Sequence, residues 1–299
     1  MIQLFTKSDI LVPSVGLGSF PLQGREMADV VKECISVGYK LIDTSDDYNG
    51  EFGIGIACGE LISEGVCNRE DLFLQTKISN NDSYNDEPLR AIYFCENSPF
   101  MKRHSVHDIV MEKVETSLKD MKTDYLDSLL IHFPYEPYYI TIWKELIKLK
   151  DEGIVRYIGV SNFHPKHIER LVKETGVRPT MNEIYLSPIG IKETQVQYAQ
   201  KNNILLMTYS PLMDLTHNRF DSSVLDEICR KYNKSKAQLI LRWNIQRGSI
   251  PLPKSSNPKR LKENIDVLDF NLTDDEIALI SSLNKDYQYL PESKNCPGI

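Results

Sequence analysis

The sequence predicts a single α/β domain over residues 1–299, a (β/α)8 barrel with an N-terminal β-hairpin cap and a C-terminal tail. Two observations lead to this fold. Eight short β-rich runs alternate with helical stretches over about 250 residues, which is the usual length of such a barrel. The first run reads GLGSF at 16–20 and lacks the third glycine of a G-x-G-x-x-G turn. A doubly wound sheet, which usually opens with that turn, is therefore the second choice.

The expected strands are short apolar runs bounded by polar or turn-forming residues. In chain order they cover residues 15–20, 41–44, 72–78, 126–133, 157–162, 180–186, 204–209 and 249–253. The expected helices lie between them and repeat apolar residues at a spacing of three and four. They cover residues 29–37, 107–121, 140–150, 165–174, 193–202, 222–232 and 258–264. Several strands are followed by Ser, Thr, Asn or Asp, which are preferred N-cap residues for the next helix.

The composition argues against several classes of protein. Hydrophobic residues make up 41% of the chain and charged residues 26%, which is enough apolar material for a large core. The 35 basic and 42 acidic side chains give a net charge of −7, so we expect no nucleic-acid partner. No apolar run reaches the roughly 18 residues that cross a bilayer, so we expect no membrane partner.

The N-terminus and the cysteines predict a cytoplasmic protein. Residues 1–10 contain no apolar block behind a basic start, so no signal peptide is expected. The six cysteines are scattered without a C-x-x-C pair, which is typical of reduced thiols. The pairs His104/His107 and His164/His167 have near-helical spacing, but no third ligand is evident. We interpret these histidines as surface residues and expect no metal site.

Polar side chains stand at the ends of the expected strands. In a barrel the chemistry lies at the carboxyl ends of the strands, so these side chains are expected to meet at one mouth. They are Asp43 with Tyr48 just beyond, Lys77, His132, Ser161, Asn162, Asn182, Glu183, Tyr209, Lys254 and Ser255.

Four of these residues, Asp43, Tyr48, Lys77 and His132, form an acid–base set. A free phenol has a pKa near 10 and is a poor proton donor at neutral pH, and a nearby ammonium is expected to lower that pKa. The carboxylate would fix the ammonium, and a neutral imidazole would orient a carbonyl oxygen through an N–H. Such a set suits protonation of an oxygen that is becoming an alkoxide. It contains neither a nucleophile–base pair nor a metal cage, so it needs a cofactor as hydride source.

Each member of the set also has an ordinary structural interpretation. A single Asp at a strand end is often an N-cap or an ion-pair partner, and a single Tyr in a loop is often a packing residue. His132 lies in an apolar run and could be a hydrogen-bonded core histidine. The four together are much harder to explain in this way than any one of them.

Five segments of the chain resemble the aldo-keto reductases, and the resemblance extends from about residue 11 to about residue 284. The segments are GYKLIDTSDDYNGE at 38–51, LQTK at 74–77, DYLDSLLIHFP at 124–134, IGVSNF at 158–163, and IPLPKS at 250–255 followed by Asn257, Arg260, Glu263 and Asn264.

The resemblance implies a (β/α)8 barrel that uses NADP(H). It implies reversible reduction of an aldehyde or ketone to an alcohol, with hydride from nicotinamide C4. Tyr48 would donate the proton, Lys77 and Asp43 would tune it, and His132 would orient the small-molecule carbonyl substrate. A monomer or a homodimer is expected.

The resemblance also implies contacts to the nicotinamide half of the cofactor. Ser161 and Asn162 would hold the carboxamide, and Tyr209 would stack on the nicotinamide ring. Ser210 and Leu212 would lie along the pyrophosphate.

The C-terminal motif is expected to bind the adenosine half. By resemblance, Lys254, Ser255 and Arg260 would bind the 2′-phosphate and adenosine, and Glu263 and Asn264 would hold the adenine edge.

The residues of this motif give an independent reason to expect a phosphate. Asn257 is a predicted N-cap, with Pro258 at the first helical position, and a helix N-terminus attracts phosphate. Lys254, Lys259 and Arg260 add positive charge in an acidic protein. This favours NADP(H) over NAD(H), because the 2′-phosphate distinguishes the two.

One position departs from the family pattern. Glu183 stands where the family usually places a Gln that contacts the carboxamide. A carboxylate accepts a hydrogen bond from the amide NH2 but cannot donate one to the amide oxygen. We hypothesise that Glu183 weakens or repositions the nicotinamide, with Asn182 beside it available to take over part of the role.

The segment 79–105 is longer than the family pattern predicts and follows the third strand, so it is expected at the mouth. It is interpreted as a lid that specialises the substrate range, with a surface elaboration as the alternative. The C-terminal tail from Asp286, with Tyr287, Tyr289 and Leu290, is expected by resemblance to fold over the same mouth.

Two other functions remain open from the sequence. An NADP(H)-binding sensor or regulatory subunit with little turnover would keep the barrel, and Glu183 is its support. A biosynthetic reductase for one specific ketone would fit the long segment 79–105.

Overall fold

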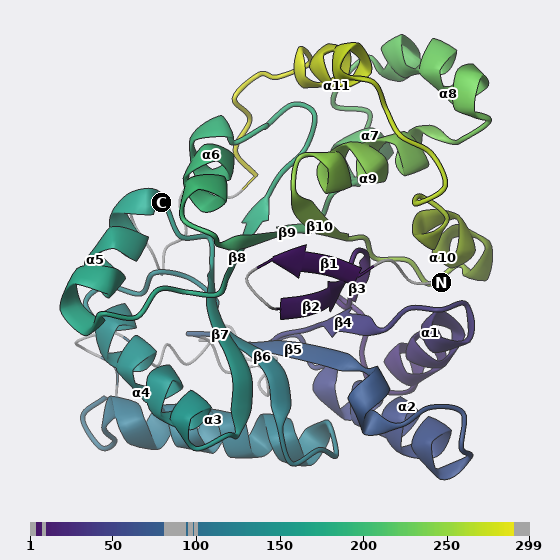
Figure 1. Cartoon of the computed structure of the whole chain (residues 1–299). Helices are drawn as coiled ribbons and strands as arrows, with labels where there is room; N and C mark the ends of the chain where they lie inside the picture. The colour runs from purple at the N-terminus through teal and green to yellow at the C-terminus, as the bar shows by residue number, and fades with distance from the viewer. Residues whose placement is uncertain (1–3, 8–9, 81–93, 95–97, 99–100, 290–299) are drawn as a thin grey trace.

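Eight parallel strands form a nearly closed barrel in the computed structural model, which describes residues 4–7, 10–80, 94, 98 and 101–289 (Figure 1). In sheet order they are β3 (Gly16–Gly18), β4 (Leu41–Asp43), β5 (Phe73–Ile78), β6 (Leu126–Ile131), β7 (Val155–Ser161), β8 (Met181–Tyr185), β9 (Leu205–Tyr209) and β10 (Ser249–Leu252). The N–H of Gly18 donates to the carbonyl of Pro253 at 3.3 Å and so links the two edges. The predicted barrel is confirmed.

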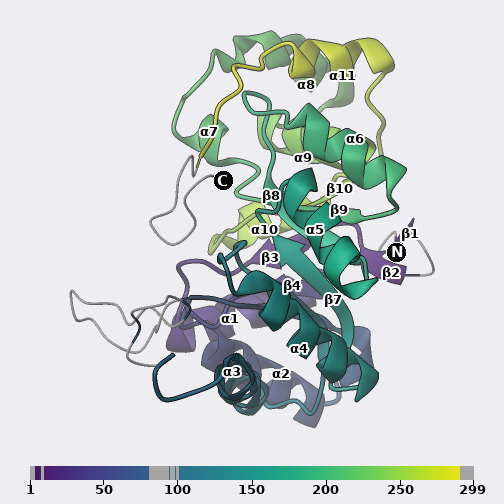
Figure 2. The same cartoon turned by 90° about the vertical axis from the view of Figure 1, so that its left-hand side faces the viewer.

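Helices surround the barrel (Figures 1 and 2). They are α1 (Gly24–Ser36), α2 (Glu51–Ser63), α3 (Val106–Asp120), α4 (Tyr139–Asp151), α5 (Pro165–Thr175), α6 (Glu193–Lys201), α7 (Met213–Thr216), α8 (Asp226–Tyr232), α9 (Lys236–Gln246), α10 (Pro258–Ile265) and α11 (Asp274–Ser281). Two 3-10 turns, η1 (Arg69–Asp71) and η2 (Ser222–Leu225), complete the set. Among the described residues, no helix is long and apolar enough to span a membrane.

Four helices, α2, α7, α9 and α11, are absent from the sequence prediction. Helix α2 carries glycines and apolar residues on all sides, so no amphipathic stripe marks it. A Cβ at Gly55 would collide with the backbone oxygen of Asp120, which shows that glycine permits close packing of α2 on the end of α3. Helix α9 is buried without interruption from Gln238 to Asn244, so it also lacks a polar face.

The inward side chains of the barrel change from apolar to polar along the strand direction. Successive side chains of a strand point to opposite faces, so every second residue faces the interior. One buried apolar cluster contains Leu41, Phe73, Leu130, Met181, Leu205, Met207, Ile250 and Leu252. Two residues further along β4, β5 and β8 come the buried Asp43, Gln75 and Glu183. The polar layer therefore rests on an apolar floor.

The predicted N-terminal hairpin is present as β1 (Leu4–Lys7) and β2 (Ile10–Pro13), which pair in antiparallel fashion. It lies across one end of the barrel, opposite to α7 (Figures 1 and 2). Val12 of β2 joins the apolar cluster of the interior. The hairpin thus closes the end of the barrel that carries the apolar floor.

Helix α2 begins with a buried carboxyl group. Glu51 is buried and its Oε1 accepts a hydrogen bond of 2.6 Å from the hydroxyl of Thr76 on β5. Burial raises the pKa of Glu51 to about 7, although its hydrogen bond with Thr76 acts in the opposite direction. The folded protein therefore binds a proton at Glu51 more tightly than the unfolded chain does.

This raised pKa predicts a pH-dependent stability. Stability from protonated Glu51 is complete below the unfolded pKa of 4.5 and is lost as the pH rises through about 7. We expect Glu51→Gln to lose less stability than the wild type between pH 5 and pH 8, by up to about 3 kcal/mol. Urea unfolding of both proteins at the two pH values measures this difference. Parallel losses in the two proteins would contradict the assignment.

Candidate active site

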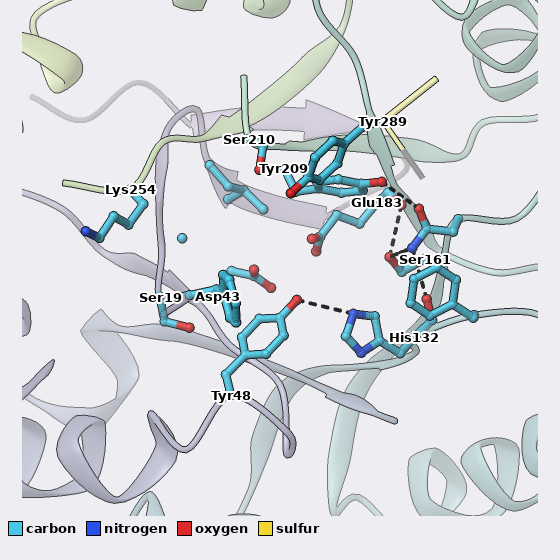
Figure 3. Close-up of a pocket in the computed structure, with 15 residues that line it drawn as sticks. Ser19, Asp43, Tyr48, His132, Ser161, Glu183, Tyr209, Ser210, Lys254 and Tyr289 are labelled. Carbon is cyan, nitrogen blue, oxygen red and sulfur yellow. Dashed lines mark hydrogen bonds between the residues drawn. The ribbon is translucent and has the colours of Figure 1, made fainter. Parts of the chain in front are cut away.

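A cavity of about 260 Å³ opens at the carboxyl ends of the strands (Figure 3). Asp43, Tyr48 and His132 line it, from the end of β4, the loop after β4 and the residue after β6. Lys77 of β5 lies behind this wall and is only 1% exposed. The structure therefore brings together all four residues of the predicted acid–base set.

Tyr48 and His132 form a hydrogen-bonded pair. The hydroxyl of Tyr48 lies 3.2 Å from Nε2 of His132 (Figure 3). On the other side of the ring, Nδ1 lies 3.1 Å from Oγ of Ser45, whose hydroxyl also reaches Oδ1 of Asp47 at 2.7 Å. Burial and the nearby ammonium of Lys77 lower the pKa of His132 to about 3, so the imidazole is neutral.

The partners of the imidazole decide which nitrogen carries its proton. A hydroxyl group can donate one hydrogen bond, and Ser45 donates its hydrogen bond to the carboxylate of Asp47. Nδ1 of His132 then donates to Ser45, and Nε2 accepts from the hydroxyl of Tyr48. To offer an N–H to a carbonyl oxygen, as the resemblance implies, the Ser45 hydroxyl must turn toward Nδ1 and give up its bond to Asp47.

The ammonium of Lys77 is shared between two carboxyl groups. Its Nζ lies 2.5 Å from Oδ1 of Asp43, 3.3 Å from Oε2 of Glu183 and 2.9 Å from the carbonyl of Thr44. Burial alone would lower the pKa of Lys77, but the two carboxyl groups outweigh it and raise the pKa. The amide of Gln75 donates to the same two carboxyl oxygens, at 2.8 Å and 2.9 Å.

The expectation that Lys77 lowers the pKa of Tyr48 is wrong for this chain. The ammonium lies 5.5 Å from the centre of the Tyr48 ring, and its hydrogen bonds go to the carboxyl cluster. Burial raises the pKa of Tyr48 well above its usual value, and the negative charges of Asp43 and Glu183 raise it further. The phenol therefore stays protonated throughout the physiological range.

The residues expected at the nicotinamide lie around the same cavity. Ser161, Asn162, Glu183, Tyr209 and Ser210 all line it. The hydroxyl of Tyr209 donates to Oδ1 of Asn162 at 2.9 Å. Asn162 and Ser210 have positive φ angles of 62° and 50°, so the chain turns sharply as it leaves β7 and β9.

The residues expected at the adenosine are divided between the cavity wall and α10. Lys254 lines the cavity, and its side chain is exposed. Asn257 is the predicted N-cap of α10, because its Oδ1 accepts from the backbone N–H groups of Lys259 and Arg260 at 3.0 Å and 3.3 Å. Of all the residues expected to bind the cofactor, six do not line the cavity: Leu212, Ser255, Asn257, Arg260, Glu263 and Asn264.

Sequence reasoning missed several residues of the site. Ser45 and Gln75 are hydrogen-bonded to the acid–base set, but each lies one or two residues from a more conspicuous neighbour. Phe20 is 61% exposed and its ring lies 5.2 Å from that of Tyr48. The expected position of the tail over the mouth is confirmed for Tyr289, which lines the cavity 6.4 Å from the Tyr209 ring. Leu290 lies outside the described residues.

Two other expectations have different outcomes. The proposed lid falls mainly on 81–93, 95–97 and 99–100, which lie outside the described residues. The interpretation of His167 as a surface residue is wrong, because it is buried against the rings of Tyr139 and Phe163. No cluster of three or more potential metal ligands occurs in the part of the chain that the structure describes.

The model of the aldo/keto reductase family matches residues 14–285. The chain belongs to this family. A glyoxal reductase from Bacillus subtilis is 36% identical, and the match covers 94% of this chain and 92% of that protein. Methylglyoxal reductase DkgA from Yersinia pestis is 33% identical, with 92% of this chain and 90% of that protein covered. This aldo/keto reductase is thus an oxidoreductase related to carbonyl reductases.

Solved structures agree with this assignment. An aldo-keto reductase from Bombyx mori in complex with NADP is 31% identical with a TM-score of 0.83, covering 96% of this chain and 94% of that one. An aldo/keto reductase from Brucella melitensis is 34% identical with a TM-score of 0.80, covering 95% and 100%.

The low pKa of His132 predicts an imidazole that does not titrate near neutral pH. Because the pKa is lowered to about 3, we expect the ring to stay neutral from pH 8 down to pH 5. Nitrogen NMR of the imidazole rings, with His132→Asn used to assign the signal, measures the protonation state. A titration midpoint above pH 5 would show that the ring is charged in the working range.

Proposed function

We propose that this aldo/keto reductase reduces an aldehyde or ketone to an alcohol with NADPH, in a reversible reaction. One observation carries the proposal. The hydroxyl of Tyr48 stands on the wall of a cavity, hydrogen-bonded at 3.2 Å to the neutral His132, with the buried Lys77 and Asp43 behind it. This arrangement delivers a proton to an oxygen and offers no nucleophile for acyl transfer.

The residues around the cavity fit a nicotinamide cofactor. Oγ of Ser19 is buried on the cavity wall without a hydrogen-bond partner, so a polar group is available to a ligand. Ser161, Asn162 and Glu183 would hold the carboxamide, and Tyr209 would offer its ring face to the nicotinamide. Bound NADPH would supply the hydride. The complex of the Bombyx mori relative with NADP supports this choice of cofactor.

The residues at the start of α10 fit the adenosine half of NADP(H). The exposed side chains of Lys254, Lys259 and Arg260 place positive charge there in a protein of net charge −7. Ser255 adds a hydroxyl group, and the N-terminus of α10 adds the positive end of the helix dipole. Glu263 and Asn264 of the same helix would hold the adenine edge, and Ser210 and Leu212 would lie along the pyrophosphate.

The acid–base set then performs the proton chemistry. Tyr48 gives its hydroxyl proton to the carbonyl oxygen as negative charge develops there. Its raised pKa ensures that the proton is present at neutral pH. The ammonium of Lys77, which pairs with Asp43 and lies 5.5 Å from the centre of the Tyr48 ring, offsets part of the negative charge of the carboxyl groups behind the phenol. His132 holds the hydroxyl of Tyr48 at the position where the oxygen must arrive.

We further propose a small carbonyl compound as substrate. The cavity of about 260 Å³ must accept the nicotinamide ring as well as the substrate. Phe20 and Phe133 supply apolar wall beside Tyr48. The similarity to a glyoxal reductase and a methylglyoxal reductase supports a small aldehyde of this kind.

Replacement of Tyr48 tests the proposed reaction. We expect Tyr48→Phe to lower the rate of NADPH-dependent carbonyl reduction by about 10²- to 10⁴-fold, because it removes the proton donor. Loss of NADPH absorbance with a panel of aldehydes and ketones measures the rate, and fluorescence titration verifies that NADPH still binds. A variant that keeps most of the wild-type rate would rule out Tyr48 as the donor.

Replacement of Arg260 tests the proposed cofactor preference. We expect Arg260→Ala to weaken NADPH binding about tenfold or more and to leave NADH binding unchanged, since a hydrogen bond to a charged group contributes about 1.5–3 kcal/mol. Lys262→Ala is the matched control, because this exposed cation lies on the same helix outside the proposed site. Equal losses for the two cofactors would refute a contact between Arg260 and the 2′-phosphate.

A further inference from the structure

The carboxyl cluster behind Tyr48 crosses the interior of the barrel. The amide nitrogen of Gln75 on β5 donates to Oε2 of Glu183 on β8 at 2.9 Å and to Oδ1 of Asp43 on β4 at 2.8 Å. The carboxyl groups of Asp43 and Glu183 point toward one another (Figure 3). Two carboxyl groups therefore share one ammonium, that of Lys77, and one amide nitrogen.

The charges of this cluster do not balance. With both carboxyl groups ionised and Lys77 charged, the cluster carries one excess negative charge in a buried place. Among the described residues, Lys77 is the one cation that forms an ion pair with Asp43 or with Glu183. A buried charge without a partner is costly, and a carboxyl group normally avoids it by taking up a proton.

The surrounding titratable groups do not remove the excess. His132 follows β6 and is neutral, while Tyr48 and Tyr209, from the β4 loop and β9, are neutral phenols with raised pKa values. Asp46, in the loop after β4, already forms an ion pair of 2.6 Å with Lys113, and Asp47 beside it is a further negative charge.

An unsatisfied acceptor in the cluster also indicates a missing proton. Oε1 of Gln75 is buried and has no hydrogen-bond partner, while the amide nitrogen of the same side chain serves two carboxyl oxygens. Buried polar atoms are normally hydrogen-bonded. One proton on a neighbouring carboxyl group would reduce the charge excess and add a donor to a cluster that is short of donors.

We propose that Glu183 is a positioning residue that carries this additional proton at neutral pH and releases it before Tyr48 ionises. The inference rests on the proposed function, because it concerns the protonation state of the proton donor. In support, burial and the neighbouring Asp43 raise the pKa of Glu183 to about 8, against the opposing effect of Lys77. The identity of Glu183 as an acid, and not only its position, then matters.

The proton on Glu183 controls the ionisation of Tyr48. Once Glu183 has lost its proton, ionisation of Tyr48 would add a second excess negative charge to the same buried region. The phenol therefore keeps its proton to high pH, which favours carbonyl reduction. In Glu183→Gln the cluster stays neutral, so the phenol ionises more easily and alcohol oxidation gains at the expense of reduction.

Ionisation of Tyr48 is measured directly on the protein without cofactor. The ultraviolet tyrosinate titration of the wild type minus that of Tyr48→Phe gives the midpoint of Tyr48, and the same pair in a Glu183→Gln background gives the comparison. We expect a midpoint lower by about one pH unit or more in Glu183→Gln, since a nearby charge shifts a pKa by this order. An equal or higher midpoint would overturn the proposal.

The proton itself is detected by infrared difference spectroscopy. We expect a protonated-carboxyl band in the wild type at pH 7, and we expect the component that disappears as the pH is raised through about 8 to be missing in Glu183→Gln. Glu51→Gln is the matched control, because Glu51 also has a raised pKa and would contribute a similar band. If Glu51→Gln removes the band and Glu183→Gln leaves it intact, the proton is on Glu51 and the proposal is overturned.

Two further arms separate this inference from the proposed function and from misfolding. Both spectroscopic readouts need no turnover, so they remain valid if no carbonyl substrate is reduced. If reduction occurs, we expect the alkaline limb of its pH profile at lower pH in Glu183→Gln than in the wild type. Coincident profiles of the two proteins would contradict this inference but not the proposed function. The double variant Gln75→Glu/Glu183→Gln restores the carboxyl group to the cluster, and we expect it to restore the midpoint of Tyr48 toward the wild-type value.

Discussion

The burial of one ammonium group organises the active site of this enzyme. Lys77 is enclosed by the barrel, where an unpaired positive charge would be very unfavourable. Its charge is compensated by Asp43, and its other polar contacts are the carboxyl group of Glu183 and the carbonyl of Thr44. Asp43 and Glu183 come from two other strands. These contacts fix the ends of β4, β5 and β8 relative to one another. The same ends carry the residues that form the cavity wall, so the ion cluster and the cavity are parts of one construction.

The interior of the barrel is divided into an apolar layer and a polar layer, and the charged cluster lies in the polar layer. The apolar floor consists of one or two residues from each of several strands, including Leu41 and Leu252. Together with Val12 of the hairpin, it excludes water from one end of the barrel. The polar layer lies above it, two residues further along each strand, where it meets the cavity. The alternation of side chains along a strand gives both layers at once, because residues two positions apart share a face. Strand register therefore determines which side chains can reach the substrate.

The sequence predicts the parts of this construction that depend on strand order alone. Eight alternating runs are enough to place Asp43, Lys77 and His132 at one mouth, and the structure agrees. Helices α2 and α9 escaped prediction because burial on most sides removes the helical stripe that a sequence pattern can detect. The pairing of Gln75 with Glu183 also escaped, since it joins strands that are not neighbours in the sheet. The pKa of Tyr48 is raised because of burial and because of the negative charges of Asp43 and Glu183, and a sequence pattern shows neither the burial of the phenol nor the approach of the second carboxyl group.

The protonation state of Glu183 bears on the substitution that first set this chain apart from its family. Where the family usually has an amide, an ionised carboxylate offers acceptors alone, whereas a protonated carboxyl group offers one O–H donor and one carbonyl acceptor. A protonated Glu183 therefore resembles the side chain that it replaces more closely than an ionised one does. The proton on Glu183 would thus preserve the hydrogen-bonding character of the cavity wall at neutral pH, and its release at higher pH would keep the proton on Tyr48. A single titrating proton on Glu183 therefore connects hydrogen bonding at the cavity wall with proton donation by Tyr48.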